Sequence, residues 1–153
     1  MKTIKAAAAV ALILAATAGV ATSAAAPGQG DVLTYAFKAA LEDPKVAAKL
    51  TPDVKLFFGD QPAKVVKEIG PTKTNTRGVR PARKTPVGER CVRVAGNALI
   101  ALANDAKERG GNAVIGIRSH AEGRPAAAQG KFDCVLGLQM VVVNLTGTVV
   151  VVE

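Results

Sequence analysis

The sequence predicts an α+β fold, a two-layer sandwich in which one principal helix, about residues 86–109, packs on a mainly antiparallel sheet. The first observation is a helical spacing of apolar residues along that segment. The second is a set of short apolar or alternating segments on both sides of it, which are typical of strands. Glycine and proline separate these segments, so the chain of 153 residues is expected to form one domain.

The first 26 residues have the order of a secretory signal peptide. Lys2 and Lys5 precede an apolar run over residues 6–20, and small residues follow up to Ala26. We expect cleavage between Ala24 and Pro27, export to the periplasm or medium, and a single domain over residues 27–153 without a transmembrane anchor. A retained N-terminal anchor is the alternative. Loss of the two lysines lowers the net charge from +8 to +6.

The first half of the exported domain combines helices and strands. Apolar residues at helical spacing predict a helix over 32–42, and the pair Asp43-Pro44 predicts the start of a short second helix over 45–50. Alternation predicts a strand over 54–58, and a second strand is expected over 63–69.

The principal helix is expected to start at Pro86 or Glu89 and to stop before Gly110. At 100° per residue, six small or apolar residues share the face that should meet the sheet. They are Cys91, Ala95, Ala98, Leu99, Leu102 and Ala106. The opposite face carries Arg93, Asn97, Asn104 and Glu108.

Three strands are expected after this helix. The first covers 113–118 and is followed by a loop over 119–131. The second, over 133–143, is apolar on both faces, as expected for a covered strand. A turn near 144–147 then leads into the last strand, which ends at 152.

Residues 70–88 have no periodic apolar pattern and contain three prolines, so we expect an exposed basic loop. From Lys73 to Arg93 the chain has seven cations and one acid, Glu89. The candidate anion-binding residues are Lys73, Arg77, Arg80, Arg83 and Lys84. An acidic envelope protein or lipopolysaccharide would fit them, whereas nucleic acid is disfavoured by export and by the absence of aromatics between Phe58 and Phe132. A merely solvated loop is the alternative.

Cys91 and Cys134 are the only cysteines. Two thiols in one small exported domain normally form a structural disulfide. A redox or metal-binding pair would need a Cys-x-x-Cys motif or neighbouring histidines, and the sequence has only one histidine, His120. We therefore expect no metal and no cofactor, and keep a heavy-metal-binding module built from Cys91, Cys134 and His120 as an alternative.

The sequence shows no catalytic constellation. Asp105 and Glu108 are expected on the helix surface without a partner across a cleft, and His120 is expected as a lone surface histidine. The segment from Gly78 to Lys84 is close to a phosphate-binding loop, but Arg83 stands where that motif needs glycine. We expect a protein without enzymatic activity.

A family resemblance adds to this interpretation. Cys91 to Arg118 reads CVRVAGNALIALANDAKERGGNAVIGIR, and together with the later Cys134 it resembles the RcsF and YbjQ-like domains. The segment LTPDVKLFFGDQPAKVVKEIG, from Leu50 to Gly70, resembles short secreted bacterial proteins that often carry the label of an excinuclease subunit.

The first resemblance implies a disulfide-braced sandwich and, for RcsF, the sensing of envelope damage through partner proteins. The sequence departs from RcsF because it has one cysteine pair instead of two and no lipidation cysteine. The second resemblance implies an accessory protein of a DNA-repair ATPase. The expected function is therefore non-enzymatic periplasmic binding or envelope-stress sensing, with the ATPase accessory as an alternative.

Overall fold

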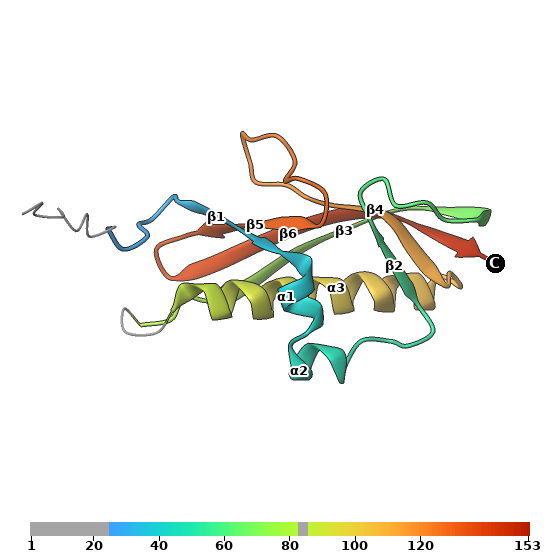
Figure 1. Cartoon of the computed structure of the whole chain (residues 1–153), viewed down its shortest axis with the longest axis horizontal. Helices are drawn as coiled ribbons and strands as arrows, with labels where there is room; N and C mark the ends of the chain where they lie inside the picture. The colour runs from blue at the N-terminus through green and yellow to red at the C-terminus, as the bar shows by residue number, and fades with distance from the viewer. Residues whose placement is uncertain (1–24, 83–85) are drawn as a thin grey trace, which may run out of the picture.

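The computed structural model describes residues 25–82 and 86–153. Nearly all of the predicted signal peptide, together with Arg83 and Lys84, lies outside the described residues. The helices and strands are, in order, β1 (Val32–Ala36), α1 (Phe37–Leu41), α2 (Pro44–Ala47), β2 (Lys55–Phe58), β3 (Val65–Val79), α3 (Val87–Glu108), β4 (Ala113–Ser119), β5 (Lys131–Leu136) and β6 (Met140–Val152) (Figure 1).

The six strands of the described residues belong to one sheet organised around β6. One edge of β6 pairs with β3 along its whole length, and the other edge pairs first with β5 and then with β4. β1 extends the sheet beyond β5, and β2 extends it beyond β4 as the one parallel pairing among the described strands. Helix α3 lies along one face of this sheet (Figure 1), so the predicted α+β sandwich is confirmed.

Helix α3 agrees closely with its prediction, and each of the six residues expected to face the sheet is fully buried. Its other side is not simply solvated, because α1 and α2 pack against it (Figure 1). Gly96 lies so close to Val46 of α2 that a Cβ atom at this glycine would lie 2.2 Å from the Val46 Cγ2 atom. Arg93 is half-buried, and its Nε atom has no hydrogen-bond partner among the described residues.

The expected disulfide between Cys91 and Cys134 is present, with the two Cα atoms 5.8 Å apart. Both cysteines are fully buried. Because Cys91 lies in the first turns of α3 and Cys134 lies in β5, the bond joins the helix covalently to the sheet.

The predicted helix over 32–42 is wrong in its first half, which is strand β1, while α1 occupies only Phe37–Leu41. Leu33 and Tyr35 pack on the core from alternate positions, and β1 pairs with β5 from Val32↔Val135 onward. The apolar residues of so short a segment fit the spacing of a helix as well as that of a strand, so the pairing of β1 with β5 decides the conformation. The short second helix is confirmed as α2, where the Asp43 carboxylate accepts a bond from the Lys45 N–H.

The predicted strand over 133–143 and the turn at 144–147 are also wrong. β5 ends at Leu136, and a tight turn follows in which the Gly137 N–H donates to the Met140 carbonyl at 2.7 Å. β6 then continues through 144–147 without a break. Leu138, 73% exposed in this turn, looks in the sequence like a strand residue. Asn144 looks like a turn residue, yet it pairs with Asn75 of β3 inside the sheet.

Candidate anion-binding face

The predicted basic loop over 70–88 is wrong for residues 70–79, which form the second half of β3. These residues pair one by one with β6, from Gly70↔Val149 to Val79↔Met140. The segment was hard to recognise because threonine takes the inward positions that apolar residues usually occupy in a strand. Thr72, Thr74 and Thr76 are buried or half-buried, and the residues between them are exposed.

Alternation along β3 places Lys73, Asn75 and Arg77 on the face of the sheet that α3 does not cover. Their partners on β6 are Thr146, Asn144 and Val142. The Asn75 side-chain amide donates to the Asn144 side-chain oxygen, and the Arg77 Nε–H donates to the Asn75 side-chain oxygen at 2.9 Å. The second of these bonds holds the Arg77 guanidinium group beside Asn75 on β3.

Two further residues lie on this face, Arg118 of β4 and His120, which follows the end of that strand. Arg118 is the partner of Thr146 on the side opposite Lys73, and the His120 Nε2 atom lies 3.1 Å from the Thr146 hydroxyl oxygen. Sequence reasoning gave no role to Arg118. A β-bulge between Ile115 and Arg118, with Gly116 at a φ of +64°, changes which residues of β4 share a face.

We call the surface formed by Lys73, Asn75, Arg77, Arg118, His120, Asn144 and Thr146 the open basic face. It contains a depression of about 330 Å³ next to Lys73, Asn75 and Thr146. The connection over 59–64 and the loop over 120–130 project from the sheet on the side away from α3 (Figure 1). The Asp60 carboxylate, in the first of these loops, accepts a hydrogen bond of 2.7 Å from Arg118.

Arg80, a predicted anion-binding residue, has a different environment. Its guanidinium group donates to the Gly137 carbonyl at 2.9 Å and to the Pro27 carbonyl at 2.6 Å. These bonds tie the start of the described chain to the turn between β5 and β6. By the alternation along β3, Arg80 also lies on the side of Gly78, which faces Val94 of α3, so Arg80 is not part of the open basic face. Arg83 and Lys84 fall outside the described residues.

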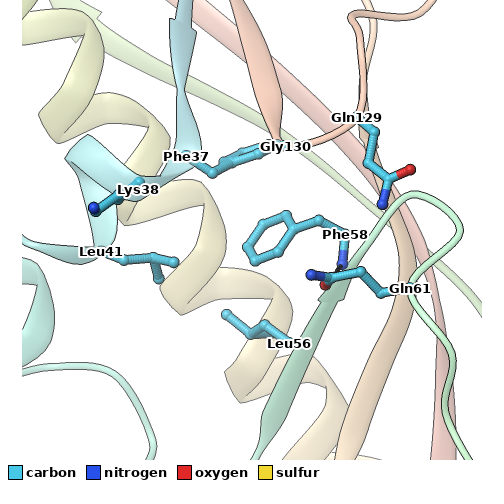
Figure 2. Close-up of a pocket in the computed structure, with 8 residues that line it drawn as sticks. All are labelled: Phe37, Lys38, Leu41, Leu56, Phe58, Gln61, Gln129 and Gly130. Carbon is cyan, nitrogen blue, oxygen red and sulfur yellow. Dashed lines mark hydrogen bonds between the residues drawn. The ribbon is translucent and has the colours of Figure 1, made fainter.

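A second hollow, of about 490 Å³, lies between α1, β2 and the end of the loop that precedes β5. Figure 2 shows Phe37, Leu41, Leu56 and Phe58 along it, with Gln61 and Gln129 at one side. The Gln61 side-chain oxygen accepts a bond of 2.6 Å from the Phe58 N–H, and the nearby Lys38 forms an ion pair with Glu42. This hollow is mainly apolar, in contrast to the open basic face.

The residues of the heavy-metal alternative are not gathered by the fold. Cys91 and Cys134 are bonded to each other in the core, whereas His120 lies on the open basic face. Within residues 25–82 and 86–153, no three His, Cys, Asp or Glu side chains are close enough to hold a metal ion. In the same ranges, no helix is long and apolar enough to span a membrane.

No protein-family model matches the chain, and no curated protein sequence is significantly similar to it. Among solved structures, the chain is similar to a protein of unknown function from the DUF74 family of Pediococcus pentosaceus. The sequence identity is 13% and the TM-score is 0.48, over 65% of this chain and 98% of the other.

Proposed function

We propose that this protein is a non-enzymatic binding protein of the bacterial periplasm, of the envelope-stress type, which contacts an anionic envelope component through the open basic face. The observation that carries the proposal is the presence of Lys73, Arg77 and Arg118 on one uncovered face of the sheet. An acidic protein surface and the phosphates of lipopolysaccharide both offer the negative charge that such a face attracts.

The position of these charges supports the proposal. Lys73 and Arg77 lie on the same face of one strand, and neither of them forms an ion pair with a carboxylate of the described residues, whereas Arg118 is paired with Asp60. A disulfide in the core suits the oxidising compartment to which the N-terminal segment would direct the protein. Charges at an exposed surface act over a Debye length of about 8 Å at physiological salt, so binding should be strongest at low salt.

The test uses the oxidised protein without residues 1–26, with lipopolysaccharide vesicles and poly-L-glutamate beads as anionic probes. Lys73→Ser combined with Arg77→Ser should weaken retention at low salt roughly 30-fold, because each cation near an anionic surface contributes about 1 kcal/mol. Lys45→Ser combined with Lys49→Ser is the matched control, since it removes the same charge from exposed positions in and beside α2.

The proposal requires the control to bind like the parent protein. Equal retention of the parent and the Lys73/Arg77 variant at low salt would show that the open basic face is only a solvated surface. The location is tested separately, since cell fractionation should find the tagged protein in the periplasm without its first 26 residues. An uncleaved protein in the cytoplasm would contradict this part of the proposal.

A further inference from the structure

The longest strand of the sheet has a free edge. β3 spans 15 residues and pairs with β6 on one side, and no described strand pairs with its other side. A free edge presents a row of backbone N–H and C=O groups to which another extended chain can bind.

The hydrogen bonds next to this strand show which residues present those groups. The Arg80 N–H donates to the Gln139 carbonyl at 2.8 Å, so residues 80 and 139 form a hydrogen-bonded pair of the antiparallel ladder. In such a ladder every second pair is hydrogen-bonded, so Gly78, Thr76 and Thr74 also direct their N–H and C=O groups to β6. The residues between these pairs, namely Lys73, Asn75, Arg77 and Val79, therefore direct their N–H and C=O groups to the free edge. No hydrogen bond from these backbone groups to another described residue is present along that edge.

The usable part of the edge is limited to Thr72–Val79. Closer to its start, β3 has register shifts between Val65 and Lys67 and between Glu68 and Gly70, which interrupt regular pairing. Pro71 has no N–H group, and its carbonyl already accepts a bond of 2.9 Å from Arg109. Eight regular residues are enough for a strand of ordinary length.

The side chains at the edge indicate the charge of the partner. Lys73 and Arg77, which present free backbone groups, also point their side chains onto the open basic face. A strand added at this edge would place alternate side chains on the same face, directly beside Lys73 and Arg77. Acidic residues four positions apart would therefore pair with both cations while the backbone forms its hydrogen bonds.

In the symmetric register centred on Asn75, a second copy of this chain fits the edge poorly. In an antiparallel pair of two β3 strands centred on Asn75, Lys73 of each chain would face Arg77 of the other. Like charges directly opposite one another destabilise a strand pair.

We infer that an extended acidic segment of a partner protein binds as an added strand, antiparallel to β3, along residues 72–79. This inference rests on the proposed function, and it specifies the anionic component as a polypeptide that adopts a β-strand. Affinity comes from backbone hydrogen bonds at Lys73, Asn75 and Arg77, and charge selects the partner.

The experiment uses a synthetic peptide with glutamate at alternate positions and threonine or valine between them. A second peptide has the same sequence with N-methylated glutamate amides, which retains the charge but removes the donors that would face β3. We expect the methylated peptide to bind at least tenfold more weakly. Hydrogen exchange at the amides of Lys73, Asn75 and Arg77 should slow at least tenfold with the unmodified peptide bound.

A variant of the protein gives the complementary measurement. Asn75→Pro removes one edge N–H without removing a bond to β6, and proline is tolerated on the open side of an edge strand. Asn75→Ala is the matched control, because it retains the N–H and loses the side-chain contact with Asn144. The unmodified peptide should bind the proline variant at least tenfold more weakly than the alanine variant.

The outcomes separate this inference from the proposed function. Equal binding of both peptides, lost in the Lys73/Arg77 serine variant, would overturn strand addition and leave the proposed function intact. A failure of the proposed function would instead leave retention on vesicles and poly-L-glutamate unchanged in that serine variant. Concentration-dependent dimerisation that Asn75→Pro abolishes, without peptide binding, would overturn the inference in favour of a second copy.

Discussion

The disulfide between Cys91 and Cys134 should supply a large part of the stability of the domain. The bonded cysteines are 43 positions apart, and a cross-link that closes a loop of this length lowers the entropy of the unfolded chain by an amount worth about 4 kcal/mol. A small domain has a total stability of roughly 5–15 kcal/mol, so loss of this bond should bring the protein close to unfolding.

The assay is equilibrium unfolding in urea, with the oxidised and the reduced protein compared under otherwise equal conditions. Reduction keeps both sulfur atoms in the core and removes only the cross-link, so the free energy of unfolding should fall by about 4 kcal/mol. The Cys91→Ala/Cys134→Ala variant serves as the comparison for packing. Both side chains are fully buried, and the variant should be somewhat less stable than the reduced parent protein.

Two results would refute this reasoning. The first is a reduced protein that unfolds within about 1 kcal/mol of the oxidised one, which would mean that the cross-link does not limit the unfolded chain as calculated. The second is the titration of two free thiols in unreduced, unfolded protein taken from the periplasm, which would show that Cys91 and Cys134 are not bonded in the cell.

Two further predictions concern the core. Gly96→Ala should destabilise the protein by about 1–3 kcal/mol, although alanine usually improves a helix by about 1 kcal/mol, because its Cβ would clash with Val46. In a Val46→Ala background the loss should be much smaller, because the two Val46 methyl groups are gone and only the Cβ atom of residue 46, at 3.1 Å, remains close to the new methyl group. Urea unfolding of the four proteins measures this coupling, and equal effects in both backgrounds would contradict it. Burial raises the pKa of Tyr35, the one tyrosine of the chain, above its ordinary value of 10.0. As the pH rises, the tyrosine ionises in the unfolded protein before it does in the native protein, so the free energy of unfolding should fall above a pH of about 10. The midpoint of tyrosine ionisation, measured by ultraviolet absorbance, should be higher in the native protein than in urea, and coincident midpoints would refute this.

The sequence was most informative where a single periodicity continued over many residues. Helix α3 spans 22 residues, and six of its nine buried residues could be derived because six helical turns repeat the same pattern; Val94, Gly96 and Ala103 were not among them. The pairing of Cys91 with Cys134 followed from the number of cysteines and the exported context. Neither prediction depended on how distant segments align.

The strands were less predictable because their boundaries depend on register. The β1 segment is short enough to satisfy a helical spacing, and only its pairing with β5 makes it a strand. The turn at Gly137 has an exposed Leu138, whereas Asn144 lies inside β6, so the usual association of polar residues with turns was reversed. Tertiary pairing overrode local propensity in both places.

The residues of the open basic face could also be predicted only in part from the sequence, because register decides which of them come together. Lys73 and Arg77 could be selected by charge alone, but Arg118 joins them only because β6 lies between β3 and β4 in a particular register. The bulge at Gly116 then decides which side of β4 carries Arg118. Charge composition therefore indicated what kind of partner to expect, and register decided which cations meet it.

The alternation of residues along β3 connects the charge of the open basic face with the free backbone groups at the edge of the sheet. In a strand with one free edge, the residues that present unpaired backbone groups all have side chains on the same face. In β3 these residues include Lys73 and Arg77, and the threonines between them form the bonds to β6. Exposed edges often carry cationic side chains, because these discourage pairing with another copy. The same two side chains would attract an acidic strand, so protection against self-association and selection of a partner follow from a single arrangement.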